Sequence, residues 1–222
     1  MSNVQFLSHI TRAGDPGWPG NPTLKVKAFS QIQSGDIANT YQLELFNHFG
    51  THMDSPNHFN PKGIPLVQLP ASSFVFHNPY LLDQPLANNT LLTADHLRHH
   101  QLADVDCLLI RSGFESVRTT DPYRYAEFGP GVGSGAAEYL MTNCPALRII
   151  VLDWLSISAY QQREDGYLAH QVLSGAQGHN RYILGVEDAT LKDLEQVPKW
   201  VMAAPLRVEG TDGGPCTVMA GF

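Results

Sequence analysis

The sequence has few cysteines and few basic residues, and each shortage excludes a class of protein. Its three cysteines, Cys107, Cys144 and Cys216, are an odd number at wide spacing. This pattern argues against a disulfide framework and against a cysteine zinc site, and it fits a reducing compartment. Fourteen lysines and arginines against 21 acidic residues give a formal net charge of −7. A basic nucleic-acid-binding surface is therefore not expected.

Long apolar runs are also missing from the sequence. The longest, such as residues 149–152, have the size of strands, whereas a membrane-spanning helix needs about 20 consecutive apolar residues. Residues 1–20 lack a basic start followed by an apolar run, so no signal peptide is expected. We therefore expect a soluble, cytoplasmic protein with neither a membrane nor a nucleic-acid partner.

The pattern that is present predicts one α/β domain over residues 1–222, with residues 1–21 as an N-terminal arm. Strand-like stretches occur at Tyr41–Asn47, Cys107–Arg111, Leu147–Asp153, Arg181–Val186 and Trp200–Ala204. Helices are best supported at Thr93–His99, Gly135–Asn143 and Ala189–Leu194. The stretches at 107–111 and 147–153 are almost wholly apolar, which favours a mixed sheet covered by helices.

Ten histidines stand out in this composition, and three of them fall in one short segment, FNHFGTHMDSPNHF, at residues 46–59. These are His48, His52 and His58, and Asp54 lies between them. Gly50 and Pro56 disfavour a helix here. In an extended chain the even offsets would place all four side chains on one face, but about 33 Å apart at the ends, too far for one site. We expect a strand end that bends back at the glycine and the proline.

Imidazole and carboxylate groups together bind Zn²⁺, Mn²⁺ or Fe²⁺, so this segment predicts a metal site, and Asp54 could bridge two ions. One segment does not supply a full ligand set. His170 and Glu187 are candidates for the rest, but spacing alone does not select them from His77, His96, His99, His100 or His179.

Residues 48–59 follow the pattern H-x-G-T-H-x-D-x-P-x-H-F at every fixed position. This pattern resembles the signature of the cyclase family of metal-dependent hydrolases, which includes bacterial kynurenine formamidases and isatin hydrolases. Weaker similarities to the family occur at residues 17–22, 106–113, 129–140, 151–158, 169–173, 185–191 and 204–220.

The resemblance implies a swivelling β/β/α fold, in which a mixed, barrel-like sheet is flanked by helices. It implies one or two divalent ions, Zn²⁺ first and Mn²⁺ as a second choice. The implied metal ligands are His48, His52, Asp54, His170 and Glu187, with Asp54 as the bridge. His58 takes the role of general acid and base. The family commonly has Glu-Asn where this chain has Glu187-Asp188, which leaves Asp188 as an additional acid near the site.

The resemblance also suggests how a substrate binds. Trp18 matches a family position that covers the site, and Phe46, Phe49 and Phe59 flank the ligands. Aromatic walls suit a flat aryl substrate. Packing in the core or at a dimer contact is the alternative for these rings. Because the family commonly forms dimers, we expect a homodimer or higher homo-oligomer.

The expected activity is hydrolysis of an aryl formamide similar to N-formylkynurenine, or of a related cyclic amide, by metal-activated water. Two alternatives stay open: lactam ring opening as in isatin hydrolases, and a non-catalytic protein that binds a metal or a small molecule on the same fold. A cupin-type dioxygenase is disfavoured, because cupins place two histidines two residues apart whereas His48 and His52 are four apart.

Overall fold

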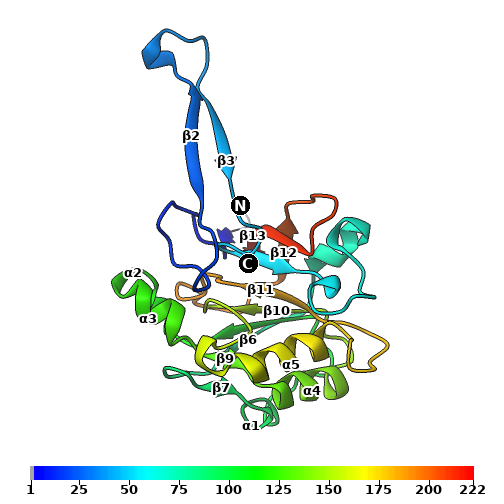
Figure 1. Ribbon diagram of the computed structural model, residues 1–222. Helices are drawn as coiled ribbons and strands as arrows, with labels where there is room; N and C mark the ends of the chain where they lie inside the picture. The colour runs from blue at the N-terminus through cyan, green and yellow to red at the C-terminus, as the bar shows by residue number, and fades with distance from the viewer. Residues whose placement is uncertain (1–2) are drawn as a thin grey trace.

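A sheet of nine strands forms the centre of the protein in the computed structural model, which describes residues 3–222 (Figure 1). Eight strands follow the order β5-β12-β13-β4-β11-β10-β8-β6, and β1 pairs with β13 outside this path. Their bounds are β1 Val4–Phe6, β4 His52–Asp54, β5 Val75–Phe76, β6 Pro79–Asp83, β8 Cys107–Arg111, β10 Ile149–Leu152, β11 Leu184–Glu187, β12 Trp200–Pro205 and β13 Gly213–Gly221.

The sheet is mixed, as the sequence predicted. Strands β6, β8, β10 and β11 are parallel to one another, while β4 is antiparallel to both of its neighbours, β11 and β13. The remaining pairs, β13 with β12 and β12 with β5, are also antiparallel. Strand β4 therefore joins a parallel half of the sheet to an antiparallel half.

Helices cover one face of the parallel half (Figure 1). They are α1 Ala94–Leu97, α2 Val117–Thr120, α3 Pro122–Glu127, α4 Ser134–Asn143 and α5 Arg163–Leu173. A short parallel pair, β7 Leu91–Leu92 with β9 Gly131–Val132, lies beside them. Short 3₁₀ turns occur at η1 Ile32–Ser34, η2 Pro56–His58, η3 Leu66–Gln68, η4 Ala71–Phe74, η5 Phe114–Ser116 and η6 Tyr160–Gln162.

Two hydrophobic cores lie on opposite faces of the parallel strands. Along β8, Leu108 and Ile110 belong to the core beneath the helices, while Cys107 and Leu109 belong to the core on the other face. The alternation follows from the two-residue period of a strand, and it explains why the apolar run shows no polar face.

The strand expectations at 107–111, 147–153, 181–186 and 200–204 are confirmed with boundary shifts of no more than three residues, and the helix at 135–143 is confirmed as α4. The helix expected at Ala189–Leu194 is wrong. Its apolar side chains, Ala189, Leu191 and Leu194, are buried in the second core as part of a loop. The backbone N–H of Leu191 donates to Glu115 Oε2 at 2.9 Å instead of to a helical carbonyl. The apolar residues at 189, 191 and 194 are therefore explained by burial of a loop and not by a helix.

Helix α5 was not among the helices expected from the sequence, and it contains Gly166 although glycine disfavours helix interiors. The structure shows why glycine is there. A Cβ atom at this position would lie 2.4 Å from Ser158 Oγ, so only glycine lets the helix approach the loop that follows β10. This close packing brings α5 to the metal-ligand segment.

An antiparallel hairpin, β2 Lys25–Ser30 with β3 Thr40–Glu44, projects from the body of the protein (Figure 1). The N-terminal segment itself is tied to the sheet: Val4–Phe6 pairs with β13, and Leu7 is buried in the second core. Residues 1 and 2 of the expected arm lie outside the described part of the chain.

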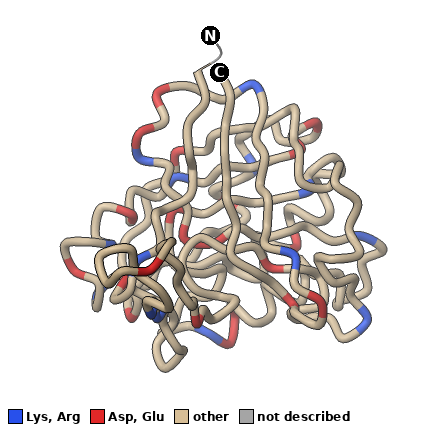
Figure 2. Tube along the Cα trace, turned by 90° about the horizontal axis from the view of Figure 1, so that it is seen from above, with Lys and Arg blue, Asp and Glu red and all other residues tan. Residues whose placement is uncertain are grey.

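Lys and Arg residues are interspersed with Asp and Glu residues along the chain trace in the view of Figure 2. Over residues 3–222, the helices are all too short or too polar to cross a membrane.

Candidate metal centre

The histidine-rich segment bends as its sequence predicted. Gly50 adopts a left-handed φ of +67°, which glycine favours, and the chain then enters β4. Pro56 ends the extended stretch by starting the 3₁₀ turn that carries His58. His52 and Asp54 point to the same side of β4 because they are two residues apart, and Met53 points into the second core.

Strand β11 places Glu187 directly opposite His52. The His52 Nε2 atom lies 3.2 Å from Glu187 Oε2 and 3.6 Å from Asp54 Oδ1. Glu187 is oriented from the other side by Ser156 Oγ, which donates to its Oε1 at 3.0 Å, and by the backbone N–H of Ile157. The adjacent pairing of β4 with β11 thus brings together two segments that are far apart in sequence.

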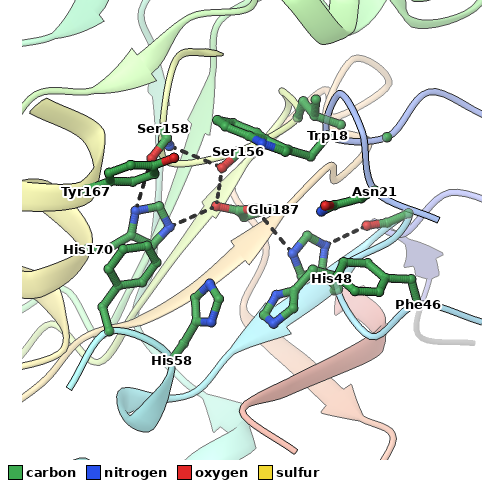
Figure 3. A pocket seen from close by; sticks show the side chains of 15 residues that line it. Trp18, Asn21, Phe46, His48, His58, Ser156, Ser158, Tyr167, His170 and Glu187 are labelled. Carbon is green, nitrogen blue, oxygen red and sulfur yellow. Dashed lines mark hydrogen bonds and ion pairs between the residues drawn. The ribbon is translucent and has the colours of Figure 1, made fainter. Parts of the chain in front are cut away.

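Helix α5 supplies His170, whose Nε2 atom lies 3.5 Å from Glu187 Oε1 (Figure 3). The same atom lies 3.5 Å from Asp54 Oδ2. The Nδ1 of His170 donates to the backbone carbonyl of Gly166 at 2.8 Å, and the Nδ1 of His52 donates to that of Gly50 at the same distance. A hydrogen bond at one ring nitrogen leaves the other free for a metal. Both Nε2 atoms are therefore available to a metal, and both face carboxylates.

The donor set fits a divalent cation. His52, Asp54, His170 and Glu187 are all buried, and Asp54 Oδ2 has no hydrogen-bond partner among residues 3–222. A buried carboxylate oxygen without a partner is costly unless a cation or proton meets it. Donor atoms of His48, His52 and Asp54 lie within 4.8 Å of one another, and so do those of Asp54, His58 and His170. Because Asp54 belongs to both groups, it is placed where a bridge would be.

The pKa values of these groups show the same preference for positive charge. Burial disfavours the His48 imidazolium, but hydrogen bonds to Asp212 and Asp54 outweigh burial and raise its pKa to about 10. Burial likewise opposes His170, whose pKa is nevertheless raised to about 9 by Asp54 and Glu187. Burial and Asp54 oppose the Glu187 carboxylate, yet His170 and His52 lower its pKa to about 2. The carboxylates attract positive charge into a buried space, as ligands of a cation do.

A cavity of about 210 Å³ opens beside these groups (Figure 3). Its aromatic lining consists of Trp18, Phe46, Phe59 and Tyr167, together with the histidine rings. Phe59 stacks on His170 with the ring centroids 4.3 Å apart. Phe49, which the sequence suggested as a substrate contact, does not line the cavity: it is 1% exposed and packs beneath Gly17. Phe46 lies on the cavity wall instead.

Asp212 is a site residue that the sequence interpretation missed. Its Oδ2 accepts a hydrogen bond from His58 Nδ1 at 2.7 Å, and its Oδ1 lies 3.2 Å from His48 Nε2. The available signal was the family similarity over residues 204–220, but no pattern linked an acid there to a histidine 154 positions earlier. The residue comes just before β13, which pairs with β4, and so the sheet delivers it to the site.

Two further buried acids, Asp188 and Asp153, are part of the protein's framework. Asp188 is fully buried with φ of +52°, and its carboxylate accepts two hydrogen bonds of 2.8 Å from Arg118 and one from the Tyr125 hydroxyl. Asp153 accepts hydrogen bonds from Ser112 and Gly113. Neither carboxylate lines the cavity.

Comparison with known proteins shows the family of this chain. The family model described as putative cyclase matches residues 6–159. A kynurenine formamidase from Geobacillus thermodenitrificans is 27% identical over 201 residues, which cover 90% of this chain and 88% of that protein. Cyclase-like protein 1 from Arabidopsis thaliana is 27% identical over 221 residues, covering 96% of this chain and 82% of that protein.

Solved structures confirm the expected fold. Isatin hydrolase A from Labrenzia aggregata, bound to benzyl benzoate, superimposes with a TM-score of 0.83 at 20% identity, over 99% of this chain and 93% of that one. The resemblance carried by residues 48–59 is thereby confirmed, because the family match spans more than half of the sequence. The chain belongs to the putative cyclase family.

Proposed function

We propose that this protein is a metal-dependent amide hydrolase acting on the carbonyl of an aryl formamide, an arylformamidase. The proposal rests chiefly on one observation: His58 lines the cavity beside the candidate ligands, and its Nδ1 is held by Asp212. A histidine oriented by a carboxylate in this way has its second nitrogen free to accept a proton. The kynurenine formamidases among the relatives support the substrate class.

His48, His52, Asp54, His170 and Glu187 are the residues that would hold the cation, with Zn²⁺ the first choice and Mn²⁺ the second, as one ion or two. A divalent cation at such a site lowers the pKa of water and polarises a carbonyl oxygen. Both effects serve amide hydrolysis at neutral pH.

The protein's own groups would orient the substrate and move the proton. Trp18, Phe46 and Phe59 form walls against which an aryl ring can stack, which directs the attached amide toward the histidines. His58 accepts a proton from the attacking water and returns it to the departing nitrogen, a contribution of typically 10²–10⁴-fold in rate.

Lactam opening of the isatin type is the second candidate, and the cavity lining favours it on one point. Within residues 3–222, none of the residues that line the cavity is Lys or Arg. N-formylkynurenine carries a carboxylate that such a residue would bind, whereas isatin is flat and uncharged. A flat, uncharged cyclic amide therefore needs no cationic partner that this lining lacks.

The test is metal analysis followed by turnover of N-formylkynurenine and isatin on the metal-loaded protein. Faster turnover of the formamide supports arylformamidase activity, and faster turnover of isatin supports the lactam alternative. A metal-loaded protein that hydrolyses neither these compounds nor a panel of amides, lactams and lactones would instead be a non-catalytic binding protein.

We also propose that the protein is a homodimer or higher homo-oligomer. In the β2–β3 hairpin, Val26 pairs with Leu43 and Ala28 with Tyr41, so these four side chains share one face. The hairpin exposes six large apolar side chains: Val26, Phe29, Ile32, Ile37, Tyr41 and Leu43. Three of the six, Val26, Tyr41 and Leu43, lie on that shared face.

An isolated two-stranded hairpin is at best marginally stable in water, so a second copy of the chain is the proposed cover for this face. Asn21, which precedes β2, and Phe46, which follows β3, both line the cavity, so the base of the hairpin lies beside the site. We further propose a reducing, cytoplasmic location, which the three free and buried cysteines support.

A further inference from the structure

Among the candidate metal ligands, His48 differs from His52 and His170 in what holds its ring. The Nδ1 atoms of His52 and His170 donate to backbone carbonyls, so their Nε2 atoms face the carboxylates. His48 is turned the other way: its Nδ1 lies 2.9 Å from Asp54 Oδ1, and its Nε2 lies 3.2 Å from Asp212 Oδ1. Asp212 thus lies beside the His48 ring nitrogen that faces away from Asp54. In His52 and His170 the corresponding nitrogen donates to a backbone carbonyl.

The second oxygen of the same carboxylate holds His58. Its Oδ2 lies 2.7 Å from His58 Nδ1, and the rings of His58 and His48 stack with their centroids 4.1 Å apart. An ionised carboxylate can only accept hydrogen bonds, so each histidine must present an N–H to it. A histidine that binds a metal or acts as a general base is a neutral imidazole with one N–H. In that state the N–H that faces Asp212 leaves Nε2 of His58 and Nδ1 of His48 without a proton.

We propose that Asp212 is a positioning residue that sets the tautomers of two histidines at once, the ligand His48 through Oδ1 and the general base His58 through Oδ2. The inference rests on the proposed hydrolase function only for the role of His58. Its claim about the two tautomers stands on the geometry of the rings in their neutral form, the form that a metal-loaded site requires of His48.

The Asp212 carboxylate is itself firmly placed. Asn47 Nδ2 donates to Oδ1 at 2.7 Å, the same oxygen that faces His48. The Asp212 backbone carbonyl accepts hydrogen bonds from Ser55 N at 3.1 Å and Ser55 Oγ at 2.7 Å. Asn47 and Ser55 both belong to the histidine-rich segment at residues 46–59. Asp212 is therefore held in place relative to His48 and His58, which it orients.

This arrangement makes Asp212→Asn and Asp212→Ala different experiments. Asparagine keeps one acceptor oxygen, and the two donors Asn47 and His48 compete for it on the Oδ1 side. The amide NH₂ then faces His58 Nδ1 and forces the proton of His58 onto Nε2. Alanine removes the partner of both rings.

The experiment measures three quantities on the Zn²⁺-loaded protein: the Zn²⁺ affinity by chelator competition, the histidine tautomers by ¹⁵N NMR of the imidazoles, and kcat and KM on N-formylkynurenine and isatin. For Asp212→Asn we expect Zn²⁺ affinity close to that of the unchanged protein, a His58 that has switched tautomer, and kcat lower by about 10²–10⁴-fold with KM little changed. For Asp212→Ala we expect the same loss of kcat and, in addition, a Zn²⁺ affinity lower by about 10–100-fold.

Glu209→Gln is the matched control, because it removes one negative charge from an exposed position on the same loop. It should change none of the three quantities. The proposal is overturned if the His58 and His48 tautomers are the same in both Asp212 variants as in the unchanged protein. It is equally overturned if either variant loses Zn²⁺ stoichiometry at saturating Zn²⁺, since Asp212 would then be a ligand. If neither substrate is turned over, the amide hydrolase proposal fails, while the tautomers and the Zn²⁺ affinity still decide the role of Asp212.

Discussion

His52 and Glu187 lie directly opposite each other on adjacent antiparallel strands, with His52 Nε2 3.2 Å from Glu187 Oε2. These two candidate ligands lie 135 positions apart in the sequence and are held together by backbone pairing rather than by flexible loops. A metal site built on strands is preorganised, because its donor groups need little rearrangement to bind an ion.

Glu187→Gln should weaken metal binding by more than about 10–100-fold. That range is the typical effect of removing a group that only orients a metal ligand. The substitution removes an anionic oxygen from a buried site that attracts positive charge. Metal content after dialysis against a weak chelator measures the effect. Glu195→Gln, at an exposed position, is the control. Equal metal content in both variants would remove Glu187 from the ligand set.

His58→Ala should lower kcat by about 10²–10⁴-fold and leave the metal content near that of the unchanged protein. The reason is that His58 is proposed to transfer a proton and not to hold the ion. Elemental analysis together with turnover on the preferred substrate makes the distinction. His77→Ala, at an exposed histidine, should change neither quantity. Loss of metal from the His58 variant would identify His58 as a ligand.

Arg118→Met should destabilise the fold by about 3–5 kcal/mol, because it leaves the buried Asp188 carboxylate without its charged partner. Chemical denaturation measures the change. The double variant Arg118→Met/Asp188→Asn should recover part of the loss, since asparagine is neutral and tolerates a positive φ. Arg98→Met, which breaks an exposed ion pair with Asp95, is the control and should have little effect. A double variant no more stable than Arg118→Met would show that charge pairing is not the cause.

Leu43→Glu should shift the protein from dimer to monomer, because it puts a charge on the apolar face of the hairpin. Gln42→Glu adds the same charge to the neighbouring strand position, on the opposite face with Lys27, and should leave the dimer intact. Sedimentation analysis of the two variants at equal concentration compares them. A monomeric unchanged protein, or equal behaviour of both variants, would contradict the proposed interface.

Asp153→Asn should change how stability depends on pH. Burial outweighs the hydrogen bonds from Ser112 and Gly113 and raises the pKa of Asp153 to about 6, above its value of about 3.9 in an unfolded chain. Because the folded state holds this proton more tightly, its contribution to stability is present at low pH and is lost as pH rises through about 6.

The unchanged protein should therefore lose about 1 kcal/mol of unfolding free energy relative to Asp153→Asn between about pH 5 and about pH 7.5. Urea denaturation of both proteins across this range measures the difference, in which pH effects from other groups cancel. Parallel pH profiles would show that Asp153 titrates at the same pH in both states.

Local patterns in the sequence determined much of this protein. The even spacing of His48, His52, Asp54 and His58 with a bending Gly50 predicted a strand that folds back, because both features act within a few residues. The apolar runs at 107–111 and 147–153 likewise predicted strands buried on both faces, since burial acts on each residue separately.

Only the tertiary structure decided which distant groups join the site. Glu187 reaches His52 through strand pairing, and Asp212 reaches His58 because β13 lies beside β4. Neither contact between distant residues produces a repeating pattern that could be recognised in the sequence. The same reason explains the wrong helix at 189–194, where tertiary burial imposed apolar spacing on a loop whose backbone bonds to Glu115. Spacing in a sequence records which side chains are buried, while hydrogen bonds between distant segments decide what the backbone does.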